Sequence, residues 1–166
     1  MRERKIVHIL VAMAAVSVVF LVGSSNTLGQ ESGEVKVARL LNDSNIKFTK
    51  IDKTTWTIPF EGRSMKDITV VTSVGQGVVV AFALIPDSKN IRFPAATLQK
   101  LLNLNETMDR VKIGIDKPGL VFVRIDMTLR TVDQEELSTA IDQVAAAVDE
   151  VHGNIREHLP KGKGGL

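Results

Sequence analysis

The chain has 166 residues, of which 44% are hydrophobic and 24% are charged, a composition typical of one globular domain. Cysteine is absent, which excludes disulfides, thiolate metal sites and cysteine nucleophiles. The net charge of +2 lies entirely in residues 1–29, and the remainder carries equal numbers of acidic and basic side chains. Charge therefore gives no support for nucleic-acid binding, which needs clustered and uncompensated Lys and Arg.

Residues 1–29 have the layout of an export signal. A basic start at residues 2–5 precedes an apolar run at 6–22, and small polar residues follow. Cleavage after Ser25 or Gly29 fits the preference for small residues before the cut. The alternative is an uncleaved membrane anchor, because 17 helical residues span about 25 Å. Both alternatives place the rest of the chain outside the cytoplasm, either periplasmic or secreted, or held at the cytoplasmic membrane.

The remainder is predicted to be a single α+β domain at 30–159, followed by a glycine- and lysine-rich tail at 160–166. The first half of this domain is expected to contain a helix at 34–41 and strands at 47–51, 55–60, 68–73 and 78–84. The tripeptide Gly75-Gln76-Gly77 favours a tight hairpin between the last two strands. The strand at 78–84 is apolar on both faces, which predicts a central strand covered on both sides.

The second half is predicted to contain a helix, a second hairpin and a long final helix. Pro94 suits the first turn of the helix, and Asn103 or Asn105 is expected to end it. Strands are expected at 110–115 and 120–127, around a turn at 116–119. The final helix is expected to begin with Asp133 and Glu136 as a capping box, to weaken at Gly153, and to bury residues spaced by three and four: Leu137, Ile141, Val144, Val148, Val151 and Ile155.

This order predicts an antiparallel sheet of about five strands with helices packed on it, α-β-β-β-(β)-α-β-β-α. Two segments then resemble a known family: Leu101-Leu102-Asn103-Leu104-Asn105, and Lys112-Ile113-Gly114-Ile115-Asp116 followed by Gly119 and a strand that ends near Met127. They resemble the YbjN-like bacterial sensory-transduction-regulator family. The resemblance spans about 34–155 and implies a type III secretion chaperone-like fold, no catalytic residues and self-association.

No residue pattern predicts catalysis, a cofactor or a metal site. His152 and His158 are six residues apart, which does not place two ligands on one helix face, and we expect both at the surface. Gly75-Gln76-Gly77 joins two strands, whereas a phosphate-binding loop leads into a helix. The acidic residues of the last helix are expected on its solvated side: Glu135, Glu136, Asp142, Asp149 and Glu150.

The sequence therefore predicts a non-catalytic protein-binding domain that acts as a regulator, adaptor or chaperone. Trp56, Ile58 and Phe60 alternate along one strand and are the candidate partner-binding residues, with sheet packing as the alternative. A homodimer through Val144, Val148 and Val151 is a further prediction, with core packing again as the alternative. Two other functions stay open. One is a membrane-tethered small-ligand sensor with a pocket lined by Phe82 and Leu84, and the other is an enzyme of unrecognised type.

Overall fold

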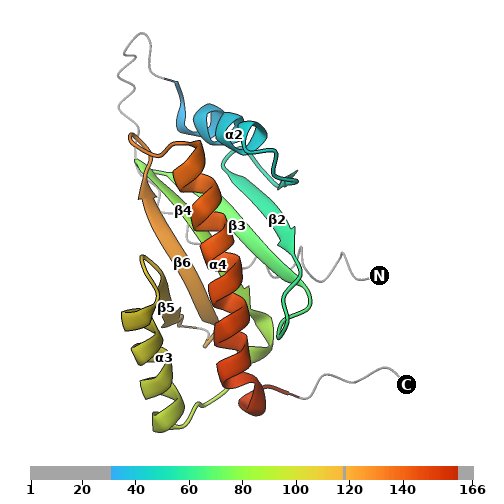
Figure 1. Cartoon of the computed structure of the whole chain (residues 1–166), viewed down its shortest axis with the longest axis vertical. Coiled ribbons are helices and arrows are strands. Elements are labelled where there is room, and N and C mark those ends of the chain that lie inside the picture. The colour runs from blue at the N-terminus through green and yellow to red at the C-terminus, as the bar shows by residue number, and fades with distance from the viewer. Residues whose placement is uncertain (1–30, 118, 161–166) are drawn as a thin grey trace, which may run out of the picture. The chain divides into compact units, whose positions relative to one another are not determined.

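A computed structural model describes residues 31–117 and 119–160, so the predicted export segment and all but the first residue of the predicted tail lie outside it. These residues form one six-stranded antiparallel sheet in the order β1-β2-β3-β4-β6-β5 (Figure 1). The strands are β1 (Thr49–Lys50), β2 (Thr55–Phe60), β3 (Ile68–Gly75), β4 (Val78–Ile85), β5 (Lys112–Ile115) and β6 (Val121–Thr128). The predicted α+β class and element order are confirmed, with the optional strand present.

Three α-helices pack on one face of this sheet. They are α2 (Gly33–Asp43), α3 (Ala95–Thr107) and α4 (Gln134–Ile155), and short 3₁₀ turns lie at η1 (Pro86–Ser88) and η2 (Arg156–His158). Figure 1 shows α4 running along the face, with α2 near its N-terminal end and α3 beside β5. The helix α4 contacts β3, β4 and β6 as well as both other helices. It is therefore the element that connects the layers.

The core lies between α4 and the sheet. The six apolar residues expected to face inward from the last helix are all fully buried, from Leu137 to Ile155. On β4 the residues beneath α4 include Ala81 and Ala83, whose small side chains allow close approach of the helix. Val144, Val148 and Val151 are completely buried, so they pack in the core, the alternative considered above.

Glycine is required at the two predicted hairpin turns. The β3–β4 turn consists of Gln76 and Gly77, both with positive φ (42° and 81°), the geometry of a two-residue turn that matches strand twist. In the β5–β6 turn Gly119 has φ of 85°, and its N–H donates to the Asp116 carbonyl at 2.9 Å. Asp116 Oδ1 also accepts the Leu120 N–H at 2.7 Å, so this side chain fixes the turn.

Three of the differences from the predicted boundaries bear on how the fold is held together. Of the strand expected at 47–51, only the two residues of β1 pair with β2. The helix expected to end at Asn103 or Asn105 continues to Thr107, because the Asn105 amide bonds to the neighbouring strand instead of closing the helix. The final helix continues through Gly153 to Ile155, whose burial holds its last turn against the core.

The second face of the sheet carries no helix within the described residues, so β4 is not covered on both sides as predicted. The apolar side chains on this face come from the three central strands and do not belong to the core; all are half-buried except Val71, which is buried at 5% exposed. The register places them side by side. We call this surface the open face and define it by Val71, Val80, Phe82, Leu84 and Phe122.

Asp133 caps α4, as predicted, by accepting the Glu136 N–H at 2.8 Å through Oδ1, but the Glu136 carboxylate accepts a bond from Arg110 at 2.6 Å instead of completing the predicted capping box. Replacing it should leave an unpaired N–H at the start of the main core helix. We expect Asp133→Ala to lower the free energy of unfolding by about 1 kcal/mol in urea titration. Asp142→Ala, at an exposed position within the same helix, should not destabilise the fold, since Ala favours helix. Equal losses in both variants would contradict the capping role.

Candidate protein-binding surfaces

The predicted partner-binding residues lie on the core side of β2. Trp56 and Ile58 are 0% and 2% exposed, and Phe60 is partly buried against the same core. The Lys50 ammonium lies 5.9 Å from the centre of the Trp56 ring and covers it from β1. A partner contact through these side chains stays a prediction, and their burial leaves only the β2 backbone and its opposite face accessible in this fold.

Both lateral edges of the sheet are poorly suited to pairing with another strand. β1 is two residues long and exposes Lys50, and the unpaired end of β2 contains Pro59, which has no N–H to donate. At the other edge the Asn105 side chain of α3 accepts the Ile113 N–H at 2.7 Å and donates to its carbonyl at 3.3 Å. The outward backbone groups of β5 at Ile113 are thus satisfied within the chain, which makes strand addition an unfavourable mode of binding.

The two histidines are not free surface residues, contrary to the prediction. His158 Nε2 lies 2.8 Å from Thr97 Oγ1, and its ring meets Phe93 edge to face at 6.1 Å. His152 Nδ1 lies 2.7 Å from Ser64 Oγ. Burial lowers the pKa of His152, and the charge of Asp149 only partly offsets this effect. Each histidine thus joins the end of the last helix to another part of the fold.

Asp149 is likewise not simply a solvated carboxylate of α4. It accepts backbone N–H groups from the loop between β2 and β3, namely those of Arg63 (3.0 Å), Ser64 (2.8 Å) and Met65 (2.7 Å). Burial acts to raise the pKa of Asp149, but these three bonds outweigh it and hold the pKa below its ordinary value. No sequence pattern indicates this long-range contact, and the structure shows that it needs glycine at position 62, where an added Cβ would collide with the Asp149 carboxylate.

The residue types of a hydrolytic triad lie close together here, as Ser64, His152 and Asp149. In a triad the carboxylate binds the histidine, and free backbone N–H groups stabilise the oxyanion. Here the Asp149 carboxylate accepts the loop N–H groups themselves, including that of Ser64. The donors that would serve an oxyanion are occupied, so the arrangement is that of a loop clamp.

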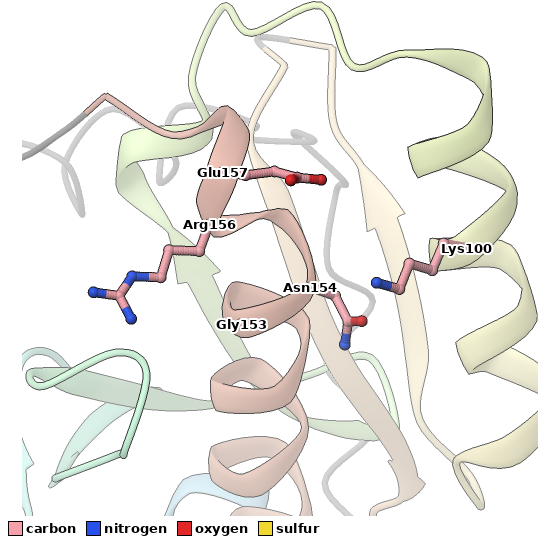
Figure 2. Close-up of a pocket in the computed structure, with 5 residues that line it drawn as sticks. All are labelled: Lys100, Gly153, Asn154, Arg156 and Glu157. Carbon is pink, nitrogen blue, oxygen red and sulfur yellow. The ribbon is translucent and has the colours of Figure 1, made fainter.

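A shallow polar groove lies between α3 and the C-terminal end of α4, with a volume of about 610 Å³. Figure 2 shows Lys100 pointing from α3 toward Asn154, and Glu157 extending over the same space, while Arg156 points away on the other side of the helix. The predicted ligand-pocket residues Phe82 and Leu84 lie on the open face and do not line this groove. Its open, polar walls lack the apolar enclosure typical of small-molecule sites.

The exposed face of α3 carries leucines that the core does not use. Leu98 and Leu102 are 38% and 63% exposed and are spaced i, i+4, so they lie one turn apart on the same side. Ile115 on the adjacent strand β5 is 42% exposed. An apolar stripe at this spacing is typical of helices that dock against another protein. The helical spacing of Leu98, Leu101 and Leu102 predicts a helix here but does not indicate which of its sides is exposed.

Neither a metal site nor a membrane span is found in residues 31–117 and 119–160. No group of three or more potential metal-ligating side chains comes together in this part of the chain. Its helices do not combine the length and apolar character required to cross a bilayer.

The Asp149 clamp predicts a pH-dependent contribution to stability. Because the pKa of Asp149 is lowered in the folded state, its contribution is present above the unfolded pKa of about 3.9 and is lost as pH falls through the folded value. We expect Asp149→Asn to cost about 1–3 kcal/mol at pH 7 in urea unfolding, and the difference from wild type to shrink below about pH 4. Asp142→Asn serves as the control. A pH-independent difference would contradict the clamp.

Comparison with known proteins agrees with the fold and its predicted family. The model of the YbjN family, described as "Putative bacterial sensory transduction regulator", matches residues 35–157. The structure of YbjN from E. coli is similar at a TM-score of 0.54 and 17% identity, covering 75% of this chain and 93% of that one. Among curated proteins, no relative matches the sequence.

Two further structures, one of a type III secretion complex and one of a chaperone–effector complex, share the same fold. A chain of the ExoU–SpcU complex of the Pseudomonas aeruginosa type III secretion system matches at a TM-score of 0.51 and 14% identity, covering 73% of this chain and 95% of that one. A chain of the HopA1–SchA chaperone–effector complex matches at a TM-score of 0.53 and 16% identity, covering 78% of this chain and 99% of that one. These likenesses confirm the predicted chaperone-like fold. With a family match over most of its described length, the chain belongs to the YbjN family.

Proposed function

We propose that this chain is a non-catalytic, exported domain that acts by binding another protein, as a regulator, adaptor or chaperone-like factor. The family description and the presence of chaperone–effector complexes among the structural neighbours support a protein-binding role. The observation that carries the proposal is the apolar stripe of α3, where Leu102 leaves 63% of its surface exposed beside Leu98. Proteins that bind a helix in an apolar groove recognise pairs of apolar side chains spaced in this way.

The stripe is presented on a helix that is fixed at both ends. Near its start, Thr97 bonds to His158 at 2.8 Å, and near its end Asn105 forms two bonds with Ile113. Leu101 faces inward and is 5% exposed, which holds the helix against the core. A binding surface on a rigid element loses little conformational entropy when a partner docks. This favours α3 over the lateral strands as the contact surface.

Partner capture tests the proposal. Chemical crosslinking in native cells, followed by mass spectrometry, should identify a stoichiometric partner of the tagged chain. The double variant Leu98→Asp/Leu102→Asp should reduce its recovery at least about tenfold, because each buried leucine contributes about 1.5–3 kcal/mol and 1.4 kcal/mol corresponds to tenfold.

Val35→Asp is the matched control, since Val35 is a 54% exposed apolar residue on α2. Its partner recovery should equal that of wild type. Circular dichroism of all three proteins checks that the fold is intact. If the leucine variant retains the partner, or if Val35→Asp loses it equally, the α3 surface is not the binding site.

Export is tested by fractionation and intact mass. The apolar run at 6–22 behind a basic start supports it. We expect a chain that begins at Asn26 or Gln30 in the fraction outside the cytoplasm. An uncleaved chain that resists alkaline extraction from membranes would support the anchored alternative. A full-length chain found only in the cytosol would contradict export.

A further inference from the structure

The apolar stripe of α3 continues onto the edge strand β5 through Ile115. Near the end of α3, Asn105 binds both backbone groups of Ile113. Only four residues connect the two elements, so the chain reverses and the start of α3 lies beside the end of β5. Two strand residues advance ~6.6 Å, the rise of about four helical residues, which places Ile115 level with Leu102. Leu98, Leu102 and Ile115 thus form one exposed apolar surface.

Three cations lie at the end of this surface where α3 begins. Lys89 and Arg92 belong to the loop between β4 and α3, Lys117 belongs to the β5–β6 turn, and all three are exposed. Within residues 31–117 and 119–160, none of them forms an ion pair with a carboxylate. Two carboxylates occur in the same segments, but Asp116 is bound within the turn and the charge of Asp87 acts on a histidine of α4. We call Lys89, Arg92 and Lys117 the cationic end.

A buried serine holds the cationic end in place. Ser88 is 0% exposed, donates through Oγ to the Ile85 carbonyl at 2.6 Å, and accepts the Val121 N–H at 2.8 Å. These bonds join the loop before α3 to the start of β6. An added Cβ at Gly119 would lie 3.3 Å from the Asn90 N, so this loop and the β5–β6 turn are in contact. The three cations are therefore presented together on a fixed backbone.

The opposite end of the apolar surface is acidic. Glu106 in the last turn of α3 and Asp109 just after the helix are exposed, and neither forms an ion pair in the part of the chain that the structure describes. The sign of the charge thus changes along the surface. An anionic lipid bilayer would be attracted at one end and repelled at the other. A protein segment can carry a different charge at each end, so the surface suits protein better than lipid.

We propose that the partner bound by α3 contributes an amphipathic helix with an acidic end, which docks on the cationic end while its apolar residues cover Leu98, Leu102 and Ile115. The inference rests on the proposed function, since it takes α3 as the binding surface. The i, i+4 ridge of α3 packs into the matching groove of a facing helix. Charge complementarity fixes the direction in which that helix docks and speeds association.

Charge reversal tests the inference on the captured partner. The triple variant Lys89→Glu/Arg92→Glu/Lys117→Glu should lower partner recovery at least about tenfold at low ionic strength, because like charges then face each other across the interface. Raising the salt concentration should weaken the wild-type complex, since exposed charges are screened.

Lys47→Glu/Lys53→Glu/Arg130→Glu is the matched control, because it makes the same change of charge at exposed positions outside α3 and its neighbouring loops. It should retain the partner, and circular dichroism checks that both variants fold. A partner kept by the first variant, or lost equally from both, would overturn this inference. The proposed function would still stand if Leu98→Asp/Leu102→Asp loses that partner. Capturing no partner at all would contradict the proposed function and this inference with it.

Zero-length crosslinking identifies what lies at the cationic end. A carbodiimide joins an amine directly to a carboxylate, so in the captured complex it should link Lys89 or Lys117 to an Asp or Glu of the partner. Mass spectrometry should place that acidic residue next to apolar residues spaced i, i+4. A link to Glu106 or Asp109 in a dimer of this chain would identify a second copy as the occupant and overturn the inference, as would the absence of any link to these lysines.

Discussion

The packing of α4 on three strands is the contact on which the rest of the structure depends. Nine side chains of this helix are buried, and α2 and α3 both reach the core partly through contact with it. Burial of each Val, Leu or Ile contributes about 1.5–3 kcal/mol, so this one helix accounts for a large share of the hydrophobic free energy of folding. Because its apolar stripe faces one side only, the helical layer forms on that side, and among residues 31–117 and 119–160 no helix covers the opposite sheet surface.

The same helix also organises the polar contacts at the margin of the fold. Asp149 and His152 lie beyond its midpoint and bind the β2–β3 loop, while His158, directly after it, holds α3. These groups are of the type found in active sites, yet Asp149 accepts backbone N–H groups and both histidines bond to hydroxyls of the chain itself, with the Glu157 carboxylate a further 3.4 Å neighbour of His158. Their role here is to fix the positions of the loop and of α3, and with them the exposed leucines.

The spacing of apolar residues and glycines predicted those structural features that depend only on residues close together in the sequence. The buried face of α4, the alternation in β2 and both hairpin turns follow from spacing and from glycine chemistry, and the structure has all of them. The bond between Asp149 and the loop joins residues more than 80 positions apart, so a local pattern contains no sign of it. The alternation in β4 likewise shows two apolar faces but does not specify whether a second layer covers Phe82 and Leu84.

The placement of Trp56 has a consequence for spectroscopy. It is the only tryptophan, and the chain contains no tyrosine, so its indole dominates the ultraviolet emission. The ring is fully buried, its N–H has no hydrogen-bond partner, and the Lys50 ammonium lies above it. An indole in so apolar a site emits at short wavelength, and it is sensitive both to the docking of the two-residue strand β1 and to loss of the core. Fluorescence of the unlabelled protein thus distinguishes release of that small strand from cooperative unfolding of the sheet.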